Sequence, residues 1–202
     1  MSTTSDADAD RMHTAGSSQL TPGAYQQAFN LAIPKPSLEH SFRLCCDLEA
    51  VRSLGQGVHA DGGQFNWVNF TGGYFEGSWG RGEIVAGGQD AQHLMPATHP
   101  SYPLAANVST RYLLRTDDGV FIQVQTRGWR TGPKDVLQRL SDAAREGFTG
   151  TAPEPTEYKF RLEVEMETDA TNQKYAWLNT AMWIGAGVRS GRQVLYDAYL
   201  VQ

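Results

Sequence analysis

A chain of 202 residues, of which 40% are apolar and 10% aromatic, is long enough for one domain with a sizeable core and for a tail. Its 17 basic and 22 acidic residues give a net charge of −5, and no basic run occurs, so nucleic acid is not an expected partner. No apolar run is long enough for a membrane-spanning helix, so a membrane is not an expected partner either.

The first residues, "MSTTSDADADRMHTAGSS", contain acids and hydroxyls where a signal peptide has a basic start and an apolar stretch, which predicts a cytoplasmic protein. The two cysteines, Cys45 and Cys46, are adjacent in a strand-like run and are expected to remain reduced thiols. Residues 1–36 read as a flexible tail or strap that ends in "IPKPS", with the first twenty residues disordered. Within it, Tyr25, Phe29 and Ile33 have the spacing of a short helix that packs on the domain.

From Leu38 the apolar residues recur every second position, which is typical of half-buried strands. "LEHSFRLCCDL" alternates in this way, and it places His40 on the apolar face as a core histidine. "EYKFRLEVEME" alternates still more regularly, and "STRYLLRTDDGVFIQVQTRG" predicts a hairpin that turns at Asp-Asp-Gly. "AWLNTAMWIGAGVR" and "QVLYDAYLVQ" read as a final pair of strands joined through "SGR".

One helix is predicted among these strands, in "GPKDVLQRLSDAAREG". Pro133 suits a first helical turn and Gly147 a helix end, and the apolar stripe consists of Val136, Leu137, Leu140 and Ala144. Many short strands with a single helix predict an all-β fold, and we expect residues 37–202 to form a single antiparallel β-barrel, because closure removes the sheet edges.

The stretch "NFTGGYFEGSWGRGEIVAGGQD" contains seven glycines but neither GxxxxGK[ST] nor a GxGxxG between a strand and a helix. It therefore does not predict a phosphate-binding loop. Bends, bulges and a turn in a barrel explain the glycines. They do not explain why Glu76, Arg81 and Asp90 lie so close to them.

Several motifs resemble the DUF3237 (UPF0311) family: "FTGGYFEGSWGRGEIVAGGQDAQ", "RYLLRTDDGVFIQVQTRG", "EYKFR", "KYAWLN" and "YDAYLV". The resemblance covers roughly residues 38–201 and implies a compact, calycin-like antiparallel barrel, in a family of small enzymes or binding proteins for apolar molecules. One segment departs from the family pattern: "FRLEVEMET" stands where "FRTTPRFET" is expected. If this strand lines the cavity, Glu163 and Glu165 invert its charge.

The candidate catalytic residues are Glu76 or Asp90 as proton acceptor or donor, Arg111 as the partner of a developing anion, and Tyr175 as a hydrogen-bond donor. The alternative for these charges is an ion-pair network or a solvated outer face. Further side chains are expected to bind substrate, although core packing is the alternative for the tryptophans; they are Tyr74, Trp67, Trp79, Arg81, Trp177, Asn179 and Arg161.

These residues suggest a cofactor-independent enzyme that acts on a small apolar carbonyl-containing metabolite by proton transfer, as an isomerase, cyclase or lyase. The alternatives are a non-catalytic carrier of an aromatic or lipid-like molecule and a structural barrel with a filled interior. The enzyme hypothesis requires Glu76, Arg111 and Tyr175 to converge on one concave space. The spacing of His93 and His99 fits no metal site, and we expect neither a metal nor an organic cofactor. The expected partner is a small molecule, and the prolines and aromatics would suit a homodimer.

Overall fold

The computed structural model describes residues 26, 28–57, 63–99, 102–144 and 149–202. The chain divides into two units, residues 1–35 and residues 36–202. In the first unit, Phe29 and Ile33 are exposed to solvent. Tyr25 and the twenty residues predicted to be disordered lie outside the described residues.

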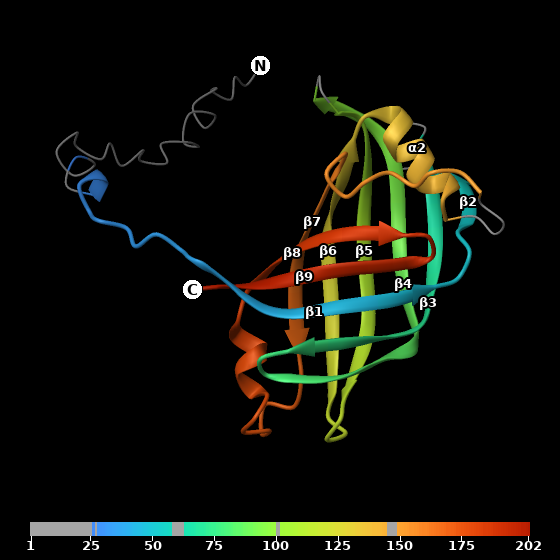
Figure 1. Ribbon diagram of the computed structural model, residues 1–202. Coiled ribbons are helices and arrows are strands. Elements are labelled where there is room, and N and C mark those ends of the chain that lie inside the picture. The colour runs from blue at the N-terminus through green and yellow to red at the C-terminus, as the bar shows by residue number, and fades with distance from the viewer. Residues whose placement is uncertain (1–25, 27, 58–62, 100–101, 145–148) are drawn as a thin grey trace, which may run out of the picture. The chain divides into compact units, whose positions relative to one another are not determined.

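The second unit is an antiparallel β-barrel (Figure 1). Its strands follow the ring order β1-β9-β8-β7-β6-β5-β4-β3, and β1 also pairs with β3, which closes a ring of eight strands. β2 pairs with the first residues of β3, on the edge that β1 uses farther along. The bounds are β1 Leu38–Leu48, β2 Arg52–Gln56, β3 Gln64–Gly77, β4 Gly80–His99, β5 Tyr102–Thr116, β6 Phe121–Gly132, β7 Lys159–Glu167, β8 Trp183–Ser190 and β9 Gln193–Val201. This architecture confirms the predicted fold class.

Alternation along the strands separates a buried interior from a wet outer face, as β7 illustrates. Its apolar residues, Phe160 to Met166 at every second position, are buried, and the charged residues between them are exposed. Glu163 and Glu165 therefore lie on the outside of the barrel. The departure from the family pattern changes the charge of the outer surface and not that of the interior.

Two predictions about single elements are wrong. A register shift between His40 and Phe42 turns His40 to the exposed side of β1, where its Nε2 lies 3.3 Å from Oδ1 of Asp197. The segment Ala176–Thr180, predicted to begin a strand, forms the 3-10 helix η1, and the strand begins only at Trp183.

β3 and β4 form a long hairpin whose two-residue turn is Ser78–Trp79, between the paired residues Gly77 and Gly80. Both strands shift register where glycines with positive φ occur, at φ 142° for Gly73 and 105° for Gly87. The shift in β3 also changes which side chains point inward: Phe70 is buried before it and Phe75 after it, an odd number of residues later. Glu76 consequently points outward.

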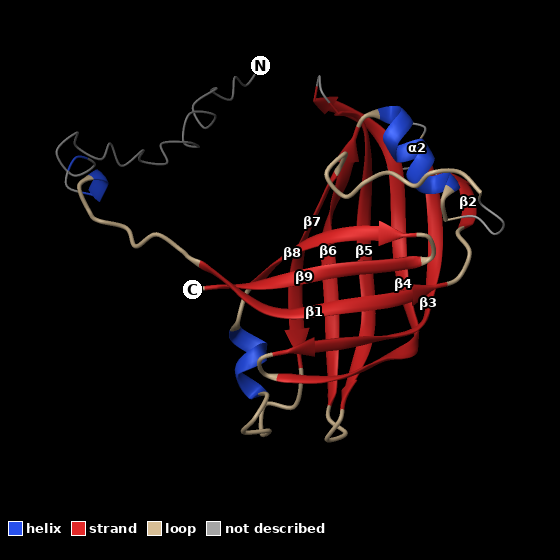
Figure 2. Cartoon of the chain, in the orientation of Figure 1, coloured by secondary structure: helices blue, strands red, loops and turns tan. Residues whose placement is uncertain are grey.

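Helix α2, Lys134–Asp142, covers one end of the barrel, with Val136, Leu137 and Leu140 buried beneath it. It begins directly after Pro133, as predicted, and Gly147 lies outside the described residues. The turn between β5 and β6 and the helix η1 lie at the opposite end (Figure 2). No helix in the described part of the chain is long and apolar enough to cross a membrane.

Candidate functional site

Charged and polar side chains occupy inward positions of the barrel near the end covered by α2. Asp90 on β4, Arg130 on β6 and Arg189 on β8 are only 5%, 7% and 6% exposed. Gln92, one inward position after Asp90, is buried with them. Since β6 ends at Gly132 and α2 begins at Lys134, Arg130 lies directly below the helix. We call Asp90, Gln92, Arg130 and Arg189 the interior cluster.

The carboxyl of Asp90 is held in an environment that favours its protonated form. Burial raises the pKa of Asp90 to about 6 from an ordinary value of 3.8, although the Gln92 amide, Arg130, Arg189 and a backbone hydrogen bond from Ser109 each lower it. Gln92 Nε2 donates a hydrogen bond to Oδ2. The other oxygen, Oδ1, is buried without a hydrogen-bond partner among the described residues. Asp90 thus offers one free acceptor to the interior.

Each of the two arginines makes one contact that holds its guanidinium group, and each has one buried nitrogen without a hydrogen-bond partner among the described residues. Arg189 Nε donates to the carbonyl of Gly191 at 3.0 Å, and the Arg130 guanidinium lies 5.7 Å from the centre of the Phe160 ring. Nη1 of Arg130 and Nη2 of Arg189 are buried and lack a partner within the described chain. Burial lowers the pKa of both arginines, that of Arg189 to about 10. Because the guanidinium group of arginine keeps its proton in proteins, both side chains are charged at neutral pH.

Two pairs of hydroxyl groups also lie in the interior of the barrel, around the cavity that Asp90 lines. The Tyr112 and Tyr196 hydroxyls are 2.6 Å apart, and those of Thr110 and Thr126 are also 2.6 Å apart. All four residues line one cavity with Asp90. A hydroxyl can donate and accept, so these pairs can supply a donor to a polar atom that approaches Asp90.

The interior contains two small cavities. One, of about 20 Å³, is bounded by Asp90, Arg130 and the hydroxyl pairs. The other, of about 30 Å³, lies between the barrel end and α2 and is lined by Arg130, Arg189 and Leu137. Gln92 and Arg130 line both, so their side chains form the partition. Each volume suffices for about one water molecule, so an organic ligand requires these side chains to move.

Aromatic packing closes the opposite end. The Trp79 ring lies 5.5 Å from Phe42, 5.3 Å from Phe75 and 6.1 Å from Tyr175. Trp183 is fully buried nearby, and its indole nitrogen donates to Ser41 Oγ at 3.2 Å. Trp79 is therefore a partly buried side chain that packs against the core, and it lines neither of the two interior cavities.

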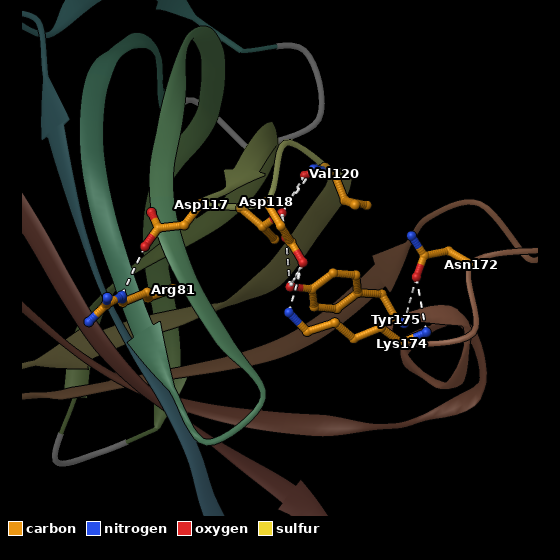
Figure 3. Close-up of polar contacts among 8 residues, drawn as sticks. Arg81, Asp117, Asp118, Val120, Asn172, Lys174 and Tyr175 are labelled. Carbon is orange, nitrogen blue, oxygen red and sulfur yellow. Dashed lines mark hydrogen bonds and ion pairs between the residues drawn. The ribbon is translucent and has the colours of Figure 1, made fainter.

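Arg81 and Tyr175 stabilise the β5–β6 turn at this end (Figure 3). Arg81 Nε donates to Asp117 at 2.8 Å, and the Tyr175 hydroxyl donates to Asp118 at 2.9 Å. Lys174 Nζ also donates to Asp118, at 2.8 Å, and hydrogen bonds from Lys174 and other neighbours hold the pKa of Asp118 well below its usual value. The two aspartates of the "RTDDG" motif thus connect the β5–β6 turn to Arg81 at the start of β4 and to the loop that precedes η1.

The remaining candidate catalytic residues do not converge. Glu76 and Arg111 are on the outer face, and Arg111 Nη2 donates to Gln125 Oε1 on the neighbouring strand at 2.8 Å. Arg111 stands between the inward residues Thr110 and Tyr112, so it must point outward. The predicted meeting of Glu76, Arg111 and Tyr175 in one concave space is therefore wrong, and Asp90 alone of the four lies in the interior cluster.

The remaining expected ligand-binding side chains also lie away from the interior. Trp67 Nε1 donates to Asn69 two residues along the same strand face, and Tyr74 and Arg161 are exposed. Trp177 is 41% exposed, and the Asn179 side chain accepts a hydrogen bond from the Thr168 amide at 2.7 Å. Their local hydrogen bonds and exposure account for these residues.

Arg111 instead belongs to open hollows on the outer face, of about 420 and 830 Å³. The larger one also contains Glu163, Glu165 and Glu167, and it brings Arg111 together with Asn179, another of the expected ligand-binding residues. Because these groups are in contact with water, their charges are screened and their mutual interactions are weak. Among the described residues, no group of three or more His, Cys, Asp or Glu side chains could hold a metal ion.

Sequence reasoning missed Arg130 and Arg189, although the alternation contains the signal. Arg130 follows Ile122, Val124 and Thr126 at every second position, and Arg189 follows Trp183 in the same way. An arginine at a position where the alternation calls for an apolar, inward-facing residue is unusual, and here both such arginines are buried inside the barrel.

Comparison with known proteins places this chain in a family. The family described as "Protein of unknown function (DUF3237)" matches residues 36–201. A UPF0311 protein of Rhodopseudomonas palustris is 26% identical over 155 residues, which cover 77% of this chain and 88% of that protein.

Solved structures agree on the fold. A β-barrel-like protein of Acinetobacter baumannii is 33% identical with a TM-score of 0.65, covering 85% of this chain and 99% of that one. A protein described as an enzyme from Penicillium herquei shares the fold at 18% identity and a TM-score of 0.56, with 85% of this chain and 99% of that one covered. The chain belongs to the DUF3237 family, to which the UPF0311 proteins are related.

Proposed function

We propose that the chain is a cofactor-independent enzyme that transfers a proton on a small carbonyl-containing molecule, with Asp90 as the proton carrier. The observation that supports this proposal is the state of Asp90: its carboxyl is buried, its pKa is raised to about 6, and its Oδ1 lacks a partner among the described residues. A general base or acid is most effective when its pKa is close to the working pH. Asp90 meets this condition near neutrality.

In the proposed step, Oδ1 of Asp90 takes a proton from the carbon next to the carbonyl group. The C–H bond breaks, an O–H bond forms on Asp90, and the electron pair moves onto the carbonyl oxygen to give an enolate. Arg130 lines the same cavity and stabilises that negative charge, and the Tyr112–Tyr196 hydroxyl pair offers a further donor. Return of the proton to another carbon gives an isomer, and loss of a leaving group gives an elimination product.

The carrier alternative accounts less well for the interior. A carrier of an aromatic or lipid-like molecule needs several hundred Å³ of mainly apolar space. The cavity beside Asp90 measures about 20 Å³, and two charged side chains, Asp90 and Arg130, are buried around it. Burying charges is costly, so their presence favours a chemical role over simple storage. The Penicillium herquei neighbour, described as an enzyme, supports the idea that this fold can carry catalysis.

Exchange with solvent deuterium tests the proposal. Small ketones, 1,3-dicarbonyl compounds and unsaturated carboxylic acids are incubated with the protein in D₂O, and deuterium at carbon is followed by NMR and mass spectrometry. Wild type is expected to accelerate exchange of at least one compound, and Asp90→Asn to lose about 100-fold or more of that rate. Glu76→Gln, which changes an exposed carboxylate on the next strand, is the matched control and should retain it. Retained exchange in Asp90→Asn, or no exchange of any compound by folded wild type, would overturn the proposal.

A further inference from the structure

The charges inside the barrel do not balance. The buried charged side chains of the described residues are Arg130, Arg189 and Asp90, so two guanidinium groups face one carboxylate and one positive charge is in excess. A buried charge without a counter-charge is strongly unfavourable. The closed interior therefore favours the entry of one negative charge.

The unsatisfied donors show where that charge would bind. Arg130 and Arg189 line the cavity under α2, and each has a buried Nη atom that lacks a partner in the described chain. The Nε atom of Arg189 donates to the Gly191 carbonyl, and its Nη2 atom remains available to a ligand. Asn66 and Gln92 add amide groups to the same wall.

We infer that the substrate of the proposed reaction carries a carboxylate, and that Arg130 and Arg189 bind it beneath helix α2. This inference rests on the proposed function of Asp90 for the chemistry but not for the binding. A carboxylate is planar, carries a single charge and accepts parallel N–H bonds from guanidinium groups. A phosphate dianion would exceed the one positive charge available, whereas a carboxylate matches it.

The position of the carboxylate limits where the reaction can occur. Arg130 and Gln92 line both cavities, so a group bound by Arg130 under α2 lies next to the space that Asp90 borders. A short acid would then present the carbon beside or one bond beyond its carboxylate to Asp90. The substrate class is therefore a small carboxylic acid with an acidic C–H bond, such as a 2-oxo, 3-oxo or unsaturated acid.

Titration with sodium propionate and sodium benzoate tests the binding. Heat of binding and thermal denaturation are measured at pH 7 and constant ionic strength, with sodium chloride and the neutral amides propionamide and benzamide as reference solutes. Wild type is expected to bind at least one carboxylate and neither amide. Arg189→Gln should bind it at least about tenfold more weakly, as expected for a lost charged hydrogen bond. Arg192→Gln, which removes an exposed arginine three residues away, should bind like wild type.

A measurement on wild type alone covers the case in which Arg189→Gln fails to fold. The side-chain ¹⁵N resonances of Arg130 and Arg189 should shift when propionate or benzoate is added and should remain unchanged with the amide. Equal responses of wild type and Arg189→Gln, or unchanged arginine resonances, would overturn the inference.

The two proposals fail in different ways. Carboxylate binding without deuterium exchange would retain the anion site and reject the role of Asp90. Exchange of neutral ketones without carboxylate binding would retain Asp90 and reject the substrate class.

Discussion

Asp90 combines a carboxyl group with surroundings that resist its charge. Its pKa is raised to about 6 in the folded chain, against 3.8 for an ordinary aspartate. Between these values the folded state retains a proton that the unfolded state has lost. The free energy of unfolding must therefore fall as the pH rises from about 4 to 6, and the loss persists above pH 6.

Asp90→Asn removes this dependence and preserves the shape of the side chain. We expect the variant to gain up to about 3 kcal/mol of stability relative to wild type between pH 4 and pH 7, from 1.36 kcal/mol for each pH unit of the difference. Urea denaturation at a series of pH values measures it. A difference between Asp90→Asn and wild type that stays constant with pH would contradict the expectation.

The Tyr112 and Tyr196 hydroxyls form a fully buried pair at 2.6 Å. Tyr112→Phe or Tyr196→Phe leaves the other hydroxyl unsatisfied and should cost about 1–3 kcal/mol. The double variant removes both groups and should cost less than the sum of the single changes. Denaturant unfolding of the four proteins completes the cycle, and additive costs would show that the hydroxyls do not interact.

At the level of the elements, the glycines of β3 and β4 differ in what they allow. A Cβ on Gly73, at φ 142°, would lie 2.1 Å from the Cys45 carbonyl oxygen on β1. Gly87, at φ 105°, has nothing within 4 Å of that position. The missing side chain of Gly73 therefore allows β1 to pack closely against the bulge in β3. Gly87 is needed only because its φ is positive.

Gly73→Ala should therefore destabilise the barrel more than Gly87→Ala. The change at Gly87 should cost about 1–3 kcal/mol from backbone strain alone. The change at Gly73 adds a clash with the backbone and should exceed it by at least about 2 kcal/mol or prevent folding. Thermal denaturation of both variants measures the two losses of stability. Equal losses would show that the close approach of β1 to Gly73 does not contribute to stability.

Helix α2 closes the end of the barrel where the interior cluster lies. It rests there mainly through Val136, Leu137 and Leu140, whereas the strands are joined on both sides by backbone hydrogen bonds. A ligand that enters from this end must displace the helix.

The amide protons of α2 should therefore exchange at least about 100-fold faster than those in the middle of β5. Hydrogen exchange followed by NMR gives both rates. Equal protection of α2 and β5 would mean that this end opens only when the whole barrel unfolds.

At the level of the whole molecule, local signals predicted the fold and one residue of the candidate site. The alternation in β7, the Asp-Asp-Gly turn and the apolar stripe of α2 each depend on neighbouring residues, and all three occur where expected. They sufficed to predict an antiparallel barrel with one helix. Asp90 was also named as a candidate from its own segment, together with Glu76, Arg111 and Tyr175.

The partners of Asp90 could not be identified in that way. Arg130 and Arg189 come from strands far along the chain, and only closure of the ring brings them to the same end of the interior. The glycine bulge in β3 also changes the phase of alternation, so the outward direction of Glu76 could not be read from its position. Long-range closure and bulges are the two features that local periodicity omits.

A titration of the Asp90 carboxyl tests the central claim of a buried proton carrier most directly. The ¹³C resonance of this carboxyl, labelled in aspartate and assigned by its loss in Asp90→Asn, is followed from pH 3 to pH 9. The predicted midpoint is about 6. A midpoint at or below 4 would mean that Asp90 is an ordinary carboxylate, and it would contradict the role of Asp90 as a proton carrier near neutral pH.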